Sequence, residues 1–183
     1  MRKESFLIAV AVAALTIALW ALCNRPEPEP PWPRIIQGFS FAPFHEGQSG
    51  ITREYPTAEQ IDADLALLSG RTHAVRTYTV DGILGDIPFL AKKHNINVAL
   101  GAWVGDDPEH NTQEIEKLLK IAGSAKNVVR LVVGNEVLLR ADVPVAKLIE
   151  YLKYVKSKTP LRVGTAEPWH VWISHPEIVP HVD

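Results

Sequence analysis

The strongest chemical signal in the sequence is an amide and a carboxylate at the end of an apolar run, in residues 132–137. The run reads Val-Val-Gly-Asn-Glu-Val, so Asn135 and Glu136 follow directly on residues typical of a buried strand. A carboxylate beside a buried strand costs free energy unless it is paired or used. A partly buried Glu136 can act as a general acid toward a glycosidic oxygen while the Asn135 amide holds a sugar hydroxyl. The competing interpretation is that Glu136 caps the following loop or pairs with Arg140.

Other polar and aromatic side chains follow the ends of the other predicted strands. They are Glu46, Gln48, Tyr78, Asp81, Asp106, Glu167, Trp169 and His170. In a barrel of parallel strands, functional residues gather at the carboxyl ends of the strands. Tyr78 and Trp169 are candidate sugar-binding faces, and the alternative is that each is a core aromatic residue. Glu167 is a candidate substrate-binding or supporting acid, and the alternative is a buried structural partner of Arg76 or Arg162.

The elements that must position these residues alternate between strand and helix from residue 35 onward. Strands are predicted at residues 35–41, 74–80, 97–104, 128–133 and 161–166, from short β-branched and apolar runs. Helices are predicted from Thr57, at 86–94, from Asn111 and at 144–158, with a helix or turn at 171–178. Thr57 with Gln60 reads as a capping box, and Asn111 with Glu114 three residues later reads as a second N-cap.

Five strands, each followed by a helical segment, predict a parallel α/β architecture. Both a doubly wound sheet and a (β/α)8 TIM-barrel agree with this alternation. No glycine-rich phosphate loop follows the first strand, which counts against a dinucleotide-binding fold.

Composition excludes several classes of function. The chain has 183 residues, 46% of them hydrophobic, and a formal net charge of −2, which is typical of a folded globular protein. Lysine and arginine form no basic stripe, so no nucleic acid partner is expected. One cysteine, Cys23, permits no internal disulfide or cysteine zinc cluster. Seven histidines lie scattered over different loops without metal-ligand spacing, so we expect no metal and no cofactor.

The N-terminal part predicts a membrane segment. Arg2 and Lys3 precede an apolar stretch at 6–23, long enough as a helix to cross a bilayer. A cleaved signal peptide and a lipoprotein site at Cys23 are the alternatives. We expect a signal-anchor at 1–25, a proline-rich linker at 26–34 and the catalytic part at 35–183. The positive residues before the helix favour a cell-membrane protein whose catalytic part faces the periplasm or the cell exterior.

At this point a series of motifs resembles glycoside hydrolase family 17, the β-1,3-glucanase family, and in particular its bacterial membrane-linked branch. The matching stretches are Gly-Phe-Ser-Phe-Ala-Pro-Phe at 38–44, Glu-Gly-Gln-Ser at 46–49, Val-Arg-Thr-Tyr at 75–78, Leu-Gly-Ala-Trp at 100–103, Val-Gly-Asn-Glu at 133–136 and Thr-Ala-Glu-Pro-Trp-His at 165–170. They occur in order, and the resemblance covers residues 35–183.

The resemblance implies a (β/α)8 barrel, of which about the first five βα units are present after the N-terminal transmembrane helix. It also implies retaining chemistry on β-1,3-glucan, with Glu136 as proton donor and base. Asn135, Tyr78, Glu167, Trp169 and Glu46 are then the expected substrate-binding residues. A retaining enzyme needs a second carboxylate as nucleophile, and the family has it on strand seven. The chain ends at Asp183, near the expected start of strand six, so no nucleophile is assigned.

Three functions remain open on these grounds. The first is hydrolysis of β-1,3-glucan, with a polysaccharide or oligosaccharide as substrate and the membrane as a partner through the N-terminal helix. The second is a transglycosylase that branches or elongates the glucan at the membrane. The third is an inactive truncated fragment that only binds glucan.

Overall fold

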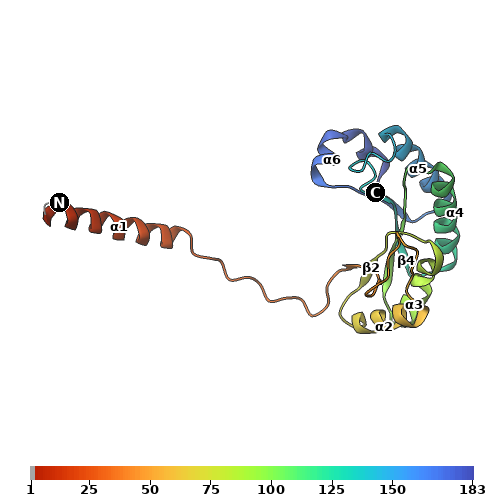
Figure 1. Ribbon diagram of the computed structural model, residues 1–183, viewed down its shortest axis with the longest axis horizontal. Coiled ribbons are helices and arrows are strands. Elements are labelled where there is room, and N and C mark those ends of the chain that lie inside the picture. Colours follow the sequence, from red (N-terminus) through yellow and green to blue (C-terminus); the bar gives the residue numbers. More distant parts are fainter. Residues whose placement is uncertain (1–2) are drawn as a thin grey trace. The chain divides into compact units, whose positions relative to one another are not determined.

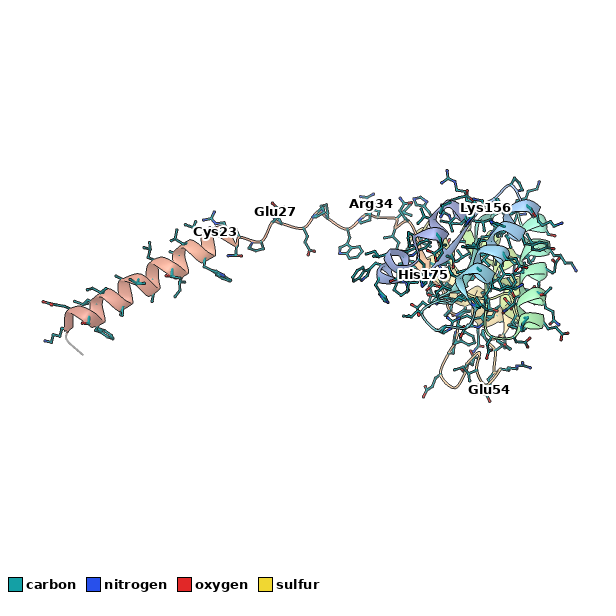
Figure 2. All side chains as sticks on the ribbon, turned by 90° about the horizontal axis from the view of Figure 1, so that it is seen from above. Cys23, Glu27, Arg34, Glu54, Lys156 and His175 are labelled. Atoms are coloured by element: carbon teal, nitrogen blue, oxygen red, sulfur yellow. The ribbon has the colours of Figure 1, made fainter. Side chains whose placement is uncertain are left out.

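The computed structural model describes residues 3–183, which divide into two compact units between Pro33 and Arg34. Residues 1–2 of the predicted anchor lie outside the described residues. The first unit contains one helix, α1 (Lys3–Cys23), followed by extended chain. None of the α1 side chains is buried, and Figure 2 shows them projecting on all sides of the helix. α1 is the one helix in the described residues that is long and apolar enough to cross a membrane.

The second unit is built on a parallel sheet whose strands lie side by side in the order of the sequence. The strands are β1 (Phe39–Ser40), β2 (Ala74–Arg76), β3 (Asn97–Ala102), β4 (Val128–Asn135) and β5 (Arg162–Ala166). This order confirms the predicted barrel arrangement. A doubly wound sheet would place its first strand in the interior of the sheet.

The 3-10 helix η1 (Gly82–Asp86) leads into α3 (Ile87–Lys93), and α6 (Trp169–Ser174) and the 3-10 helix η2 (Pro176–His181) follow β5. The helices α2 (Ala58–Leu68), α3, α4 (Pro108–Ser124) and α5 (Val145–Lys158) cover the outer side of the sheet (Figure 1). Their apolar stripes form the core with the strands: Ile61, Leu65, Leu118, Leu148 and Leu152 are fully buried. Burial of each such side chain contributes about 1.5–3 kcal/mol to stability. Together these side chains hold the helices against the sheet, and the helices in turn position the loops that follow the strands.

The two predicted caps have different outcomes. The capping box is confirmed, because the Thr57 side chain accepts from Gln60 and the Gln60 side chain accepts from Thr57. The cap at Asn111 is wrong: α4 begins earlier, where the Asp107 carboxylate accepts from two backbone N–H groups. The sequence Asp-Pro is itself a strong helix start, since proline suits the first helical position. Asn111 is buried instead, and its amide exchanges two 2.7 Å hydrogen bonds with the backbone of Gly105.

The first two strands are shorter than predicted. Strand pairing near the N-terminus is one bridge from Ile36 to Thr72, followed by the two residues of β1. β2 ends at Arg76 instead of continuing to residue 80. The predicted helix at 86–94 begins with the 3-10 turn of η1 and becomes α-helical at Ile87. The apolar pattern marked all three segments correctly, but the regular strand pairing of β1 and β2 is shorter than the apolar runs.

The buried carboxylate of Glu114 bonds to the loop that follows β2. Glu114 lies on α4 and is only 3% exposed. Its oxygens accept from the Thr79 hydroxyl at 2.8 Å, from the Val80 N–H at 3.1 Å and from the Trp103 N–H at 3.0 Å. The backbone at Val80 and Trp103 therefore bonds to a helix side chain rather than to a neighbouring strand. One carboxylate thus ties the loop after β2 to the loop after β3.

We expect Glu114→Ala to lower the free energy of unfolding by about 3–5 kcal/mol, because it leaves the buried Val80 N–H and the partly buried Trp103 N–H without an acceptor. Glu114→Gln, which keeps one acceptor oxygen, should cost less than half as much. Urea unfolding of both variants measures this. Glu116→Ala, an exposed change on the same helix, is the control. Equal stability of Glu114→Ala and Glu116→Ala would show that the buried carboxylate does not hold these loops.

Candidate active site

The carboxyl end of β4 is bent by an irregularity in its pairing with β5. Val132 pairs with Gly164 and Asn135 pairs with Ala166, so three steps along β4 match two along β5. Gly134 lies inside this irregularity with a φ of +80°. A Cβ at Gly134 would lie 2.3 Å from the Val137 side chain. Glycine is therefore required here, both for the positive φ and for the close approach. Such bulges re-aim the side chains that follow them.

Glu136 follows the bulge immediately, in a conformation that is costly for a residue with a side chain. Its φ is +56°, and its N–H donates to the Ala166 carbonyl at 2.7 Å. Its side chain is exposed rather than partly buried, which corrects the expectation from sequence. The predicted alternative of a pair with Arg140 is also wrong, because the Arg140 guanidinium pairs with Asp142 at 2.6 Å. Among residues 3–183 the Glu136 carboxylate forms no ion pair, so it is open to a ligand.

Asn135, the last residue of β4, is held by an arginine two strands away. Arg76 at the end of β2 donates from Nη2 to the Asn135 side-chain oxygen at 2.6 Å. The same guanidinium lies over the Tyr78 ring, 4.7 Å from its centroid. The Arg76 Nε is buried and has no acceptor among the described residues. The structure thus brings Asn135 and Tyr78 together through Arg76, which the sequence did not indicate as a partner of either residue.

Glu167, which follows β5, is engaged by backbone rather than by arginine. Its carboxylate accepts from the Leu138 N–H at 2.9 Å and from the Leu139 N–H at 3.4 Å. The predicted alternative of a pair with Arg76 or Arg162 is therefore wrong in its partner, although a supporting role remains. These two amides belong to the turn that follows Glu136. Glu167 consequently holds the backbone of the residues that directly follow Glu136.

The remaining predicted residues, Glu46 and Trp169, lie on the surface. Glu46 is exposed in the loop between β1 and α2, next to His45, whose ring nitrogen lies 3.0 Å from an Asp64 oxygen. Glu54 of the same loop projects from the sheet and helices in Figure 2. Trp169 begins α6 and is 75% exposed, with its ring edge-on to His170. Trp169 is therefore no core residue, and a planar exposed ring of this kind can stack on a sugar.

A pocket of about 470 Å³ opens between the loops that follow β1, β2 and β3. Its lining includes the aromatic residues Phe41, Phe44, Tyr55, Tyr78 and Trp103 and the polar residues Arg53, Asp81, Asp106, Asp107 and His110. Sequence reasoning missed Tyr55 and Trp103 as site residues, although Trp103 directly follows a predicted strand. Glu136 does not line this pocket. No group of three or more histidine, cysteine, aspartate or glutamate side chains in residues 3–183 is arranged to hold a metal ion.

Tyr55 and Asp81 close one side of the pocket with a short hydrogen bond. The Tyr55 hydroxyl donates to an Asp81 oxygen at 2.6 Å. This bond raises the pKa of Tyr55 to about 12, and desolvation adds to the shift. The same bond, reinforced by the Gly82 N–H, lowers the pKa of the Asp81 carboxyl despite its partial burial. The pair joins the loop after β1 to the loop after β2.

Comparison with known proteins gives consistent matches. A family model described as the BtgE/BtgC glycoside hydrolase domain matches residues 38–183. The probable glucan endo-1,3-β-glucosidase of Aspergillus flavus is 28% identical over 136 residues, which are 68% of this chain and 20% of that protein. The glucan 1,3-β-glucosidase of Schizosaccharomyces pombe is 30% identical over 124 residues, which are 60% of this chain and 38% of that protein. The chain therefore spans about a fifth to two fifths of the length of these relatives.

Solved structures agree in fold. The glycoside hydrolase family 17 β-1,3-glucanosyltransferase of Rhizomucor miehei superposes with a TM-score of 0.66 at 25% identity, over 81% of this chain and 55% of that one. An active-site mutant of the same enzyme in complex with laminaritriose gives a TM-score of 0.61 at 25% identity, over 72% of this chain and 49% of that one. The likeness supports a TIM-barrel architecture. The predicted membership of a bacterial membrane-linked branch stays a prediction.

The pKa shifts of Tyr55 and Asp81 predict a pH-dependent effect of Tyr55→Phe. At neutral pH the variant should lose about 1 kcal/mol of unfolding free energy, a modest value because the pair is partly exposed. A depressed pKa of Asp81 contributes stability above the ordinary carboxyl pKa, and this contribution is lost as the pH falls through the folded value. A raised pKa of Tyr55 contributes stability below about pH 10, which is lost as the pH rises through about 12.

Urea unfolding of wild type and Tyr55→Phe between pH 2 and pH 9 measures this difference. It should be constant from about pH 5 to 9 and shrink below about pH 4. Tyr154→Phe is the matched control, since its hydroxyl bonds Glu116 on the exposed surface. A difference that persists undiminished at pH 2 would show that the ionised Asp81 is not the partner that matters.

Proposed function

The chain belongs to the BtgE/BtgC glycoside hydrolase family, and on that basis we propose that it is a retaining glycosidase acting on β-1,3-glucan, with Glu136 as its acid and base. The relatives named as glucan glucosidases and the laminaritriose complex of the Rhizomucor enzyme support this substrate class. Because the chain spans only part of each relative, the activity of the whole protein is part of the proposal.

The single observation that carries the proposal is the state of Glu136. Its carboxylate is exposed and free of ion pairs within residues 3–183, yet its backbone is held at a φ of +56°. Strained backbone of this kind persists only where the surrounding structure over-determines it, and it clusters at active sites. A carboxyl group aimed in this way protonates the departing glycosidic oxygen in the first step. In the second step the same carboxylate removes a proton from the attacking water.

A retaining reaction also requires a carboxylate nucleophile about 5–5.5 Å from the acid. Two nearby carboxylates are already engaged in the structure: Glu167 by backbone N–H groups and Asp142 by Arg140. We assign the nucleophile to no residue within 3–183. The proposed role of Glu167 is therefore to support the turn after Glu136.

We place the substrate across the carboxyl ends of the strands. Asn135, oriented by Arg76, is suited to hold a sugar hydroxyl next to the bond that breaks. Tyr78 and the exposed Trp169 offer ring faces for the apolar side of a pyranose. Glu46, exposed in the loop after β1, offers a hydrogen-bond acceptor to a more distant sugar.

Glu136→Gln in the full-length protein should reduce turnover of laminarin by at least about 10²–10⁴-fold, the usual contribution of acid-base assistance. Release of fluoride from a β-glucosyl fluoride needs no proton, so the first step on that substrate should be largely spared. A burst of fluoride measured by rapid mixing gives that step. Equal losses on both substrates would contradict the assignment, and laminarin binding without any turnover by wild type would contradict the enzymatic proposal itself.

Transglycosylation is a second candidate, favoured by the likeness to an enzyme named as a β-1,3-glucanosyltransferase. The two functions share the residues described above and differ in whether water or a sugar takes the second step. Incubation of the full-length protein with laminari-oligosaccharides separates them. Hydrolysis yields only shorter products, whereas transfer also yields longer or branched ones. We expect longer products to increase with acceptor concentration if transfer is the natural reaction.

We also propose that α1 anchors the protein in a membrane, with the glucan-active part outside. A helix of 21 residues rises about 31 Å at about 1.5 Å per residue, close to the hydrocarbon thickness of a bilayer. The proposed division is an anchor at 1–25, a stiff proline-rich linker at 26–34 and the barrel part at 35–183. Arg2 and Lys3 favour the cytoplasmic side for the start of the chain.

The anchor predicts that washing membranes with alkaline carbonate leaves the protein in the pellet. Protease added from outside should cut within the linker at 26–34 and release the second unit. Immunoblotting with N-terminal sequencing of the released piece measures both. Release of all of the protein into the soluble fraction, with a new N-terminus near Ala21, would indicate a cleaved signal instead.

A further inference from the structure

The turn after β4 contains an arginine whose side chain reaches back over the strand ends. Arg140 donates from Nη1 to the Asn135 carbonyl and from Nη2 to the Val104 carbonyl at 2.9 Å. The same guanidinium contacts Asp142 from Nε at 2.8 Å and from Nη2 at 2.6 Å. Its flat face lies over the Trp103 ring, 4.3 Å from the centroid. Backbone from the ends of β3 and β4 thus meets on one planar cation.

Arg140 holds the chain on both sides of Glu136. The carbonyl that precedes Glu136, that of Asn135, accepts from the Arg140 side chain. The carbonyl of Glu136 itself accepts from the Arg140 backbone N–H at 2.9 Å. The Glu136 N–H is bound separately by the Ala166 carbonyl. Of these three backbone groups around Glu136, one bonds to the Arg140 side chain, one to the Arg140 backbone and one to Ala166.

The guanidinium is itself locked in place, which a positioning role requires. Asp142 offsets its charge, and the Trp103 ring covers one face. The backbone of Trp103 is held in turn, because its main-chain N–H donates to the buried Glu114 carboxylate. Arginine suits this arrangement because its five donors lie in one rigid plane, whereas a lysine presents a single charged nitrogen. With Asp142 beside it, Arg140 acts on Glu136 through geometry more than through charge.

We propose that Arg140 is a positioning residue that holds Glu136 in its left-handed conformation and so aims the catalytic carboxyl group, with Asp142 and Trp103 fixing Arg140. This rests on the proposed role of Glu136 and adds a residue that does not touch the substrate. Arg140→Lys removes the planar set of guanidinium donors but keeps the positive charge. A displacement of about 1 Å at a reacting group can cost about 10²-fold in rate, so kcat on laminarin should fall by about that factor. KM should change less than about threefold, because substrate contacts remain.

The test compares Arg140→Lys, Asp142→Asn and Arg71→Lys in the full-length protein. Arg71 is exposed in the turn after α2 and is the matched control. Laminarin turnover should fall strongly for Arg140→Lys, about tenfold for Asp142→Asn and not at all for Arg71→Lys. The fluoride burst from β-glucosyl fluoride should fall much less than laminarin turnover in both active-site variants. Turnover of Arg140→Lys within threefold of wild type, or equal losses on both substrates, would overturn the proposal.

A crystal structure of Arg140→Lys supplies a readout that does not depend on activity. The proposal predicts that φ of Glu136 leaves the positive region and that the side chain turns away from its wild-type direction. Retention of the wild-type φ would overturn it, whatever the kinetics. If wild type itself shows no turnover of β-glucan, the proposed function fails. This structural comparison still decides whether Arg140 holds Glu136 in its left-handed conformation. If Arg140→Lys does not fold, the same comparison on Asp142→Asn decides.

Discussion

The structure of the site depends on a short stretch of left-handed backbone at the end of β4. Gly134 and Glu136 both have positive φ, and the pairing with β5 slips by one residue between Val132 and Asn135. Glycine accepts this conformation without cost, whereas a residue with a Cβ gives up about 1–2 kcal/mol. This irregularity ends the strand pairing of β4 before Glu136 and leaves the Glu136 carboxylate exposed. Without it, the strand would alternate onward and bury or redirect the acid.

Two charged residues order the loops at this edge of the sheet, and each bonds to backbone groups that follow two different strands. Glu114 accepts from the backbone after β2 and after β3. Arg140 donates to carbonyls at the ends of β3 and β4. Trp103 joins the two, since its backbone N–H donates to Glu114 and its ring lies under the Arg140 guanidinium. Parallel strands end at one edge of a sheet, so a few such contacts suffice to order several loops at once.

Sequence reasoning predicted the alternation of strands and helices because apolar periodicity reports burial directly. It also placed Asn135 and Glu136 at the end of the fourth strand, and the capping box at Thr57. Sequence reasoning failed where a buried polar side chain forms hydrogen bonds that the apolar periodicity does not report. Asn111 and Glu114 look like a helix start, yet both are buried: Asn111 bonds to the backbone of the loop before α4, and Glu114 bonds to the loop after β2. Arg140 looks like a partner for Glu136, yet it bonds to the backbone around that residue. These roles depend on loops that become neighbours only after folding.

The central claim is that Glu136 occupies strained backbone because the site needs its carboxylate there. The most direct measurement compares the free energies of unfolding of Glu136→Gly and Glu136→Ala in the full-length protein. Both variants remove the carboxylate, and they differ only in the Cβ. At a φ of +56° the glycine variant should be the more stable by about 1 kcal/mol, while neither variant turns over laminarin. An alanine variant that equals or exceeds the glycine variant in stability would contradict the claim, because it would mean that the backbone at this position carries no strain.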